Sequence, residues 1–299
     1  MHNSICISQK NLQGKEQKQH GDKSFPVAFY FDDLVKFPVS WHWHDEFELA
    51  IIVKGQTEFF SESDKNVLDK SEGIFINSGI LHSAYDFDKS NSQLRSIVFH
   101  PKFIGGNSDS VFWQKYIHPL VNNSFVKSLC LSSSVSWQKE IIDSINIAWE
   151  IGTEKKYGYE ILVRNYLSKI IFLLNQNCSQ KSEIILEKSD RDSSRIKKMI
   201  EYIHFNYDSE ITVQDIAEKA FISETECLRC FRNIIGISPI QYLINVRLQN
   251  AAEKLTTTNE RIINIGLSCG FHDMSYFSKA FQRFFGQTPS AYRKNHKEL

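Results

Sequence analysis

Apolar and polar residues alternate over short distances in the first part of the chain. Between residues 25 and 99, brief apolar runs are separated by Gly, Asn, Asp and Ser. Runs of this kind, closely spaced and bounded by turn residues, are typical of a β-sandwich or barrel. We therefore expect a β-domain here, with strands that include residues 47–53, 57–60, 73–76 and 94–99.

Helical spacing replaces this alternation after residue 111. Residues 137–150 predict an amphipathic helix with Ser136 as its N-cap, and residues 159–176 predict a second helix. The two helices either pack on the β-domain or meet a partner chain, and the pattern leaves both open. A charged, polar segment at 181–194 is expected to be an interdomain linker.

The last hundred residues contain an internal repeat. The first copy is marked by Phe231, Gly236, Pro239 and Tyr242, and the same intervals recur 50 residues later in Phe281, Gly286, Pro289 and Tyr292. Each copy reads as two helices around a tight turn, which is the helix-turn-helix motif. The second helix of such a motif enters the major groove of DNA.

Capping residues and the connecting segment support this interpretation. Ser223 and Asp273 are expected to begin the second helix of each unit, and Gly236 and Gly286 to end it. Residues 238–255 read as one continuous helix that spans about 27 Å. Successive major grooves on one face of DNA lie ~34 Å apart. A helix of this length could therefore hold the two helix-turn-helix units in adjacent major grooves of one DNA site.

The second helix of each unit carries an outer row of residues on a different side from its apolar stripe. In the first unit the row contains Thr225, Leu228, Arg229 and Arg232, and in the second Ser275, Ser278, Lys279 and Gln282. Arg229 and Lys279 occupy equivalent positions in the two rows. Both can donate hydrogen bonds to guanine O6 and N7 or to phosphate.

Charge and composition add little to this picture but contradict none of it. Lys plus Arg equals Asp plus Glu over the whole chain, while residues 194–299 hold 14 basic against 11 acidic residues, a net of +3. Residues 1–24 are polar, are expected to be flexible and show no secretory signal. No apolar run in the sequence is long enough to span a membrane. We therefore expect a cytoplasmic protein without membrane contact, in which Cys227 and Cys230 are reduced helix thiols rather than a redox or zinc site.

Residues 196–293 resemble the DNA-binding domain of AraC/XylS-type transcription regulators. The resemblance lies in Arg247-Leu-x2-Ala251-x3-Leu255, in the run from Gly270 to Phe277, and in Phe281-x4-Gly286-x2-Pro-Ser-Ala-Tyr-Arg293. Two positions depart from the family pattern, because Gly266 replaces the common Ala and Leu228 replaces a polar residue. The resemblance implies base contacts from Thr225, Leu228, Arg229, Met274, Ser275, Ser278 and Lys279, and phosphate contacts from Arg232 and Arg283.

A second constellation lies near the start of the β-domain, where His42, His44 and Glu48 have the spacing His-x-His-x3-Glu. In one straight strand His42 and Glu48 would lie about 20 Å apart, so their convergence requires a bend near Asp45. The stretch resembles the first cupin motif, in which the histidines end one strand and the glutamate begins the next. Gly73-x8-His82 resembles the second motif, although Gly79 stands where proline is usual. The resemblance implies His82 as the fourth member of the cluster.

Three roles for His42, His44, Glu48 and His82 remain open. The cluster binds a small-molecule effector, holds a divalent metal ion, or makes structural hydrogen bonds without a ligand. In AraC-type regulators the cupin-like domain is usually a sensor for a small molecule, often a sugar. Imidazoles and carboxylates suit hydroxyl-rich ligands because they donate and accept in fixed directions.

These observations predict an α+β protein with two domains. The expected parts are a flexible segment at 1–24, a cupin-like effector-binding and dimerisation domain at 25–180, a linker at 181–194 and a double helix-turn-helix domain at 195–299. The predicted function is a homodimeric regulator, an activator by analogy, that binds double-stranded promoter DNA, responds to an effector such as a carbohydrate, acts on RNA polymerase and requires no cofactor. A metal-dependent cupin enzyme fused to a DNA-binding module, and a regulator whose barrel only dimerises, are the alternatives to this non-enzymatic function.

Overall fold

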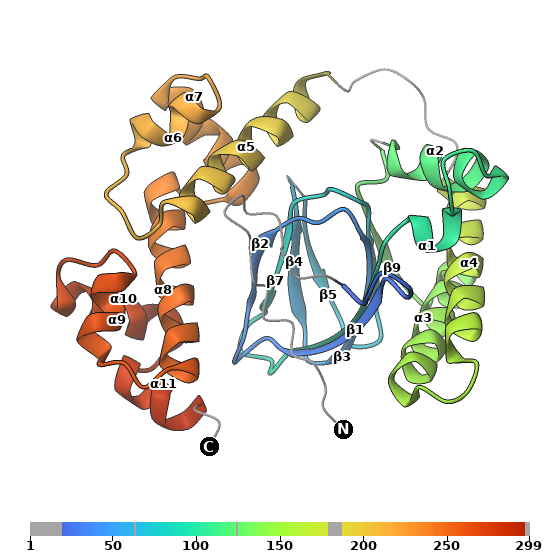
Figure 1. The fold of residues 1–299 in the computed structure, drawn as a ribbon, viewed down its shortest axis with the longest axis horizontal. Helices are drawn as coiled ribbons and strands as arrows, with labels where there is room; N and C mark the ends of the chain where they lie inside the picture. The colour runs from blue at the N-terminus through green and yellow to red at the C-terminus, as the bar shows by residue number, and fades with distance from the viewer. Residues whose placement is uncertain (1–19, 63, 124, 179–186, 297–299) are drawn as a thin grey trace. The chain divides into compact units, whose positions relative to one another are not determined.

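The computed structural model describes residues 20–62, 64–123, 125–178 and 187–296. The chain divides into two compact units, the first ending at Asp190 and the second beginning at Arg191. Figure 1 shows strands and helices in the first unit and helices alone in the second. The predicted α+β class, with a β-domain ahead of a helical domain, is confirmed.

Two antiparallel sheets form the β-part of the first unit (Figure 1). The predicted strands correspond to β3 (Phe47–Lys54), β4 (Thr57–Ser61), β6 (Gly73–Ile76) and β8 (Gln93–Phe99), and the burial of β4 alternates as expected for a strand with one buried face. The five-stranded sheet has the order β1 (Val27–Asp33), β8 (Gln93–Phe99), β3 (Phe47–Lys54), β6 (Gly73–Ile76) and β9 (Ser128–Leu131). The four-stranded sheet has the order β2 (Val39–His42), β7 (His82–Asp86), β4 (Thr57–Ser61) and β5 (Asp64–Leu68).

Helices α3 (Ser136–Glu154) and α4 (Tyr159–Cys178) cover the five-stranded sheet (Figure 1). Phe47, Phe75 and Phe99 of the sheet share one apolar core with buried residues of both helices. The predicted amphipathic helices therefore pack within the chain. The predicted cap at Ser136 is wrong, since Ser136 is already helical and the N-cap is Val135, which makes no side-chain capping bond.

Three short helical segments lie between β8 and β9 in the chain. They are α1 (Lys102–Gly105), the π-helix η1 (Trp113–Ile117) and α2 (His118–Val121). Ile104, Ile117 and Leu120 on these segments are buried in the same core. They therefore extend the apolar core beyond the sheet and the two long helices.

The second unit is built around the long helix α8 (Pro239–Thr257). Helices α6 (Val213–Lys219) and α7 (Glu224–Cys230) lie toward one end of α8, and α9 (Ile262–Ser268) and α10 (Met274–Phe285) lie toward the other (Figure 1). The π-helix η2 (Phe231–Ile235) continues α7, and α11 (Pro289–His296) packs on α8. This arrangement is the predicted pair of helix-turn-helix units joined by one helix.

Local capping signals act as predicted in both helix-turn-helix units. Ser223 Oγ accepts a hydrogen bond from the backbone of Glu226, and Asp273 caps α10 by accepting from Ser275 and Tyr276. Gly236 and Gly286 end the second helices in the left-handed conformation, with φ of 82° and 72°. Left-handed backbone favours glycine, which has no Cβ to clash with the preceding turn.

The structure corrects the predicted linker. Helix α5 (Glu187–Phe205) begins inside the segment predicted as linker, and residues 181–186 lie outside the described residues. Charged residues made the segment resemble a linker, but an exposed helix face carries charges equally well. The buried stripe Ile196, Met199, Ile200 and Ile203 has helical spacing and ties α5 to the second unit.

The structure also corrects the predicted flexible segment at 1–24, of which residues 1–19 lie outside the described residues. Residues 20–24 are ordered by a turn in which the Asp22 carboxylate accepts hydrogen bonds from the backbone of Ser24 and Phe25, at 2.7 and 2.8 Å. The His20 side chain is buried against Tyr30. A polar composition concealed this turn because its hydrogen bonds are made by polar side chains.

Candidate functional site

The two predicted reading helices present matched exposed rows. Arg229 on α7 and Lys279 on α10 are both exposed, at equivalent positions of the repeat. Thr225, Leu228, Arg232, Ser275, Ser278, Gln282 and Arg283 are exposed as well. Phe277 and Phe281 are buried on the opposite side of α10, as Cys227 and Cys230 are on α7. The side chains predicted to contact DNA are therefore accessible, with one exception.

Met274 is the exception. It is half-buried and packs in the core of the second helix-turn-helix unit. Its sulfur lies 2.9 Å from the place where a Cβ at Gly266 would stand. The alanine expected at position 266 would collide with this side chain, so the glycine and the methionine accommodate each other. We therefore leave Met274 out of the proposed base contacts.

Arg229 is held by acidic neighbours. Its guanidinium forms an ion pair with Glu226 one turn earlier on α7, and Arg195 of α5 lies 3.5 Å from the same carboxylate. The hydrogen bond and the charge of Glu226 raise the pKa of Arg229. A contact from Arg229 to DNA therefore competes with this exposed ion pair, which is a weak interaction.

Two arginines of the AraC-type motifs hold the fold. Arg247 on α8 donates hydrogen bonds to the backbone oxygens of Tyr207 and Ser209, at 2.6 and 2.8 Å. Arg293 on α11 donates to the backbone oxygen of Leu255, at 3.2 Å. These contacts join α8 to the segment before α6 and to α11, so both arginines hold parts of the second unit together.

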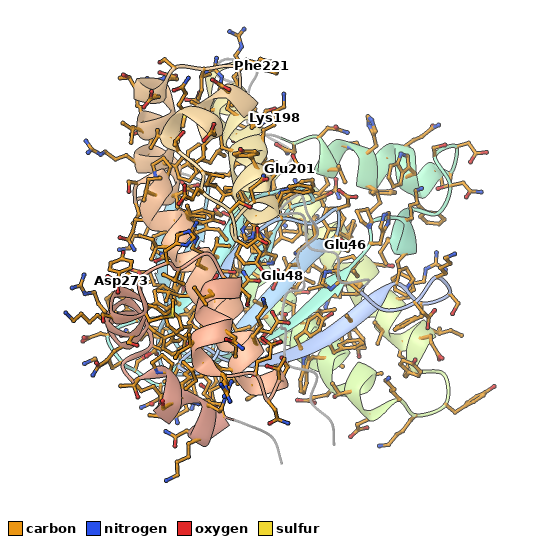
Figure 2. The ribbon with its side chains drawn as sticks, turned by 60° about the vertical axis from the view of Figure 1, so that its left-hand side comes forward. Glu46, Glu48, Lys198, Glu201, Phe221 and Asp273 are labelled. Carbon is orange, nitrogen blue, oxygen red and sulfur yellow. The ribbon has the colours of Figure 1, made fainter. Side chains whose placement is uncertain are left out.

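Two exposed aromatic residues were not predicted as site residues. Phe221 lies in the turn between α6 and α7, has a φ of 55° and is 89% exposed (Figure 2). Tyr276 is exposed on α10, one turn after the cap at Asp273. Aromatic residues in a sequence are usually assigned to the hydrophobic core, so the sequence did not identify these two as site residues.

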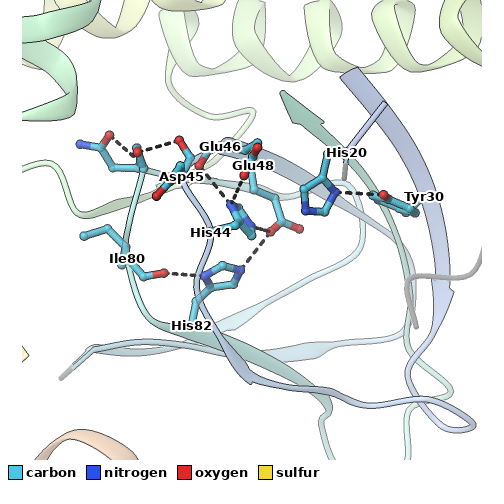
Figure 3. A network of polar contacts seen from close by, with 10 residues as sticks. His20, Tyr30, His44, Asp45, Glu46, Glu48, Ile80 and His82 are labelled. Carbon is cyan, nitrogen blue, oxygen red and sulfur yellow. Dashed lines mark hydrogen bonds and ion pairs between the residues drawn. The ribbon is translucent and has the colours of Figure 1, made fainter. Parts of the chain in front are cut away.

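The predicted polar cluster is assembled inside the β-part of the first unit. Oε2 of Glu48 lies 3.3 Å from Nε2 of His44 and 3.0 Å from Nε2 of His82, as Figure 3 shows. His42 on β2 and His82 on β7 are paired across the two strands, and their rings lie with centroids 4.2 Å apart and planes tilted by 58°. The chain bends at Asp45 and Glu46 between β2 and β3, as the spacing required. All four predicted residues therefore converge.

Burial sets the electrostatics of this cluster. The three histidines are at most 2% exposed, and the Glu48 side chain is 12% exposed. Burial alone would raise the pKa of Glu48, but hydrogen bonds and positive charge from His44 and His82 outweigh it and hold that pKa well below its usual range. The cluster therefore keeps a carboxylate anion among imidazole rings.

Hydrogen bonds to the backbone orient each imidazole. Nδ1 of every ring lies within hydrogen-bond distance of a carbonyl oxygen two residues away in sequence. The three distances are 2.9 Å from His42 to Ser40, 3.1 Å from His44 to Glu46 and 2.8 Å from His82 to Ile80. One ring nitrogen of each histidine and a carboxylate oxygen of Glu48 lie within 4.8 Å of one another. The four residues therefore fit a single divalent ion by donor type and spacing.

His20 and Tyr30 extend the cluster beyond the predicted residues. The His20 ring packs edge-on against the His44 ring with centroids 5.3 Å apart, and its Nδ1 lies 2.9 Å from the Tyr30 hydroxyl (Figure 3). Sequence reasoning missed His20 because it lies 22 residues before the first histidine of the motif, in a polar segment. Only folding places it beside His44.

The two cysteines of α7 behave as the predicted helix thiols. Cys227 and Cys230 are buried in the apolar stripe of the helix. Burial raises the pKa of Cys227 to about 12 and also raises that of Cys230. A raised pKa keeps thiols protonated at neutral pH and unreactive. Both side chains therefore contribute to the packing of α7.

Comparison with known proteins finds two family matches in the order observed. Residues 26–133 match the AraC-like ligand binding domain, and residues 216–295 match a helix-turn-helix domain. Within the part of the chain that the structure describes, no helix is long and apolar enough to cross a membrane.

Relatives match over most of the chain. The HTH-type transcriptional regulator YdeC of Bacillus subtilis is 28% identical over 94% of this chain and 96% of its own length. The lactose operon transcription activator of Staphylococcus xylosus is 24% identical over 78% of this chain and 84% of its own length. The crystal structure of an apo ToxT variant of Vibrio cholerae covers 94% of this chain and 100% of its own, with a TM-score of 0.50 and 12% identity. That likeness shows the shared fold.

The order of the two domains, the paired helix-turn-helix units and the relatives agree with one another. The chain belongs to the AraC family of transcription regulators, with an AraC-like ligand-binding domain ahead of its DNA-binding domain.

Proposed function

We propose that this protein activates transcription by binding one promoter site with both helix-turn-helix units and by responding to a small effector in its N-terminal unit. The observation that carries the proposal is the pair of matched exposed rows on α7 and α10. Such a protein acts in the cytoplasm, on double-stranded DNA, and recruits RNA polymerase; it is not an enzyme.

The length of helix α8 supports simultaneous DNA binding by the two helix-turn-helix units. Its 19 residues span about 28 Å. Adjacent major grooves on one face of DNA recur every ~34 Å, so readers packed at the two ends of α8 match that separation. Arg229 and Lys279 would read bases, and Arg232 and Arg283 would contact phosphate and set the register.

The effector acts on the first unit through the polar cluster of His42, His44, Glu48 and His82. Binding there favours one arrangement of the unit and thereby changes the equilibrium between regulator states with different DNA affinity. The lactose operon activator and the melibiose operon regulatory protein among the relatives favour a carbohydrate as the organic effector class.

Helix α4 provides the surface for a homodimer. Ile161 and Phe172 on its outward face are 75% and 53% exposed. Together with Phe112 and Tyr116 they line a groove of about 580 Å³. Exposed apolar side chains along one helix face match a second copy of the same helix, because a twofold interface pairs a patch with itself.

Selection of DNA from a random duplex library by the full-length chain tests this function. Enrichment of one motif with two half-sites about one helical turn apart is the expected result. The enriched duplex should lose affinity for a chain carrying both Arg229→Ala and Lys279→Ala, and a chain with Lys169→Ala on α4 serves as control. Selection of no motif by the folded chain would reject the proposed function.

A further inference from the structure

The two helix-turn-helix units differ at one position of the turn between their helices. Up to this turn the second unit repeats the first at a displacement of 49 residues, which relates Phe221 to Gly270. Both residues have left-handed backbone, with φ of 55° and 81°. The residue after each one, Ile222 or Phe271, donates its backbone N–H to the carbonyl five positions earlier, at 3.2 and 3.0 Å. The same turn therefore carries a large side chain in one unit and none in the other.

Phe221 is unfavourable where it stands. Left-handed backbone is rare for a bulky residue, because its Cβ crowds the neighbouring peptide. Burial of the ring does not offset this strain, since the side chain is 89% exposed and water surrounds its apolar surface. Strained residues of this kind are concentrated at functional sites. The two features together favour a role for the ring outside the folded chain.

The neighbour of this turn on the preceding long helix also differs between the two units. Nζ of Lys198 on α5 lies 6.0 Å from the centre of the Phe221 ring (Figure 2). The displacement of 49 relates Lys198 to Arg247 of α8, whose Nε lies 2.8 Å from the place where a Cβ at Gly270 would stand. Arg247 is held by backbone carbonyls, whereas Lys198 is exposed and makes no ion pair among the residues that the structure describes. Lys198 is therefore available to a ligand.

Lys198 ends a basic stripe on α5. Arg191, Arg195 and Lys198 have the spacing i, i+4, i+7, which places them on one face of the helix. Arg195 lies 3.5 Å from Glu226 in the first turn of α7, and Lys198 lies beside the turn that precedes α7. The stripe therefore follows one side of the reading helix of the first helix-turn-helix unit.

DNA bound by α7 would bring phosphates to this stripe. The major groove is about 12 Å wide and a helix with its side chains is about 10–12 Å across, so a helix in the groove is bordered by both phosphate backbones. An element packed beside α7 then lies over one of these two strands. Each nucleotide of the strand carries one negative charge, which complements the cations of α5.

We propose that Lys198 binds a backbone phosphate beside the first half-site, and that Phe221 packs against the deoxyribose of the same strand. The CH groups of the sugar give the exposed ring an apolar partner. The contact rests on the proposed function and adds to it, because Arg247 and Gly270 leave the second helix-turn-helix unit without an equivalent. Phosphate and sugar are common to all nucleotides, so this contact positions the regulator without reading bases.

Fluorescence anisotropy of the full-length chain on the selected duplex measures the phosphate contact. Lys198→Ala should weaken binding by roughly tenfold at 0.1 M salt, and should lower the slope of log affinity against log salt by about 0.9. Lys139→Ala removes an exposed lysine from α3 of the N-terminal unit and should bind as the parent does. The comparison separates a contact at Lys198 from a general loss of positive charge.

Two substitutions of Phe221 separate binding from stability. Phe221→Asn removes the ring, but asparagine tolerates left-handed backbone, so the melting temperature should equal or exceed that of the parent while DNA affinity falls. Phe221→Tyr keeps the ring and should retain the affinity. A purely structural role for the ring would instead lower the melting temperature of Phe221→Asn.

Shortened duplexes locate the contact. The half-site at which Arg229→Ala relaxes sequence preference belongs to the first helix-turn-helix unit. Removal of the base pairs outside that half-site should weaken the parent to the level of Lys198→Ala and change Lys198→Ala little. Shortening the opposite end should affect both chains alike, because the second helix-turn-helix unit has no such contact.

Parent-like affinity and salt dependence in both Lys198→Ala and Phe221→Asn would overturn this DNA contact and leave the proposed function intact. If the two variants bind DNA as the parent does but fail to activate transcription in vitro, the surface meets a protein, which also overturns the DNA contact. A folded parent chain that selects no DNA overturns the proposed function and the contact together.

Discussion

Oε2 of Glu48 lies 3.0 Å from Nε2 of His82, although 34 residues separate the two in the chain and they belong to different sheets. This contact joins the two sheets of the N-terminal unit through buried polar groups. Buried polar contacts of this kind are costly to break, because the remaining partner stays in an environment of low polarity.

Replacement of Glu48 by Ala should lower the free energy of unfolding by about 3 kcal/mol, since the buried imidazoles of His44 and His82 lose their anionic partner. The measurement is denaturant unfolding of the full-length chain in the presence of a chelator. Glu154→Ala is the matched control, because Glu154 is exposed and pairs only with the exposed Lys156 among the contacts described. Equal stability of the two variants would show that the cluster contributes nothing to the fold.

Arg229→Ala and Lys279→Ala should each weaken binding to the selected duplex by about 1–3 kcal/mol and relax sequence preference at the contacted bases. Both side chains are exposed, so the melting temperature should stay near that of the parent. Fluorescence anisotropy at fixed salt measures the affinity. An Arg232→Ala variant should instead weaken binding to all sequences alike and reduce the salt dependence. Identical effects on specific and nonspecific duplexes from all three variants would refute the assigned reading roles.

Glu226→Gln should strengthen DNA binding several-fold. The carboxylate of Glu226 holds Arg229 and lies 3.5 Å from Arg195, so its neutralisation releases one cation and removes an anion near the expected phosphates. The ion pair is exposed and its loss should cost under about 1 kcal/mol of stability. Glu218→Gln on α6 is the control for the removal of one negative charge. Weaker binding by Glu226→Gln would mean that the ion pair orients Arg229 for reading.

Asp273→Ala should destabilise the C-terminal unit by about 1 kcal/mol, because the N-terminal turn of α10 loses its cap. Fraying there also displaces Ser275 and should lower DNA affinity. Asp273→Asn is the matched comparison, since asparagine caps a helix about as well as aspartate. Thermal unfolding and anisotropy on the same samples separate the two effects. A loss of affinity in Asp273→Asn equal to that in Asp273→Ala would show that the loss of the cap is not its cause.

Phe172→Asp should shift the protein from dimer to monomer in sedimentation velocity experiments. The substitution places a charge in the exposed apolar face of α4, where dimer formation would have to bury it. Ile161→Leu keeps that face apolar and should leave the dimer unchanged. A dimer that persists in Phe172→Asp at micromolar concentration would place the interface elsewhere.

The sequence by itself determined the features that depend on local signals. The spacing of Phe231, Gly236, Pro239 and Tyr242, and its repetition 50 residues later, is sufficient to predict two helix-turn-helix units. Ser223, Asp273 and the two terminal glycines act where they were predicted, because a cap is made by residues within one helical turn. The bend near Asp45 also followed from sequence, since one straight strand cannot bring His42 to Glu48.

Only the tertiary structure decided which residues from distant segments meet. His20 joins the polar cluster through a turn that the polar N-terminal composition concealed. Met274 packs in the core because Gly266 leaves room for its sulfur. The position of Met274 on the faces of α10 does not reveal this contact with a residue of another helix. Glu48 and His82 meet because β3 and β7 lie in different sheets that face each other. Local sequence sets the conformation of each segment, whereas close packing of all segments together selects the neighbours of each side chain.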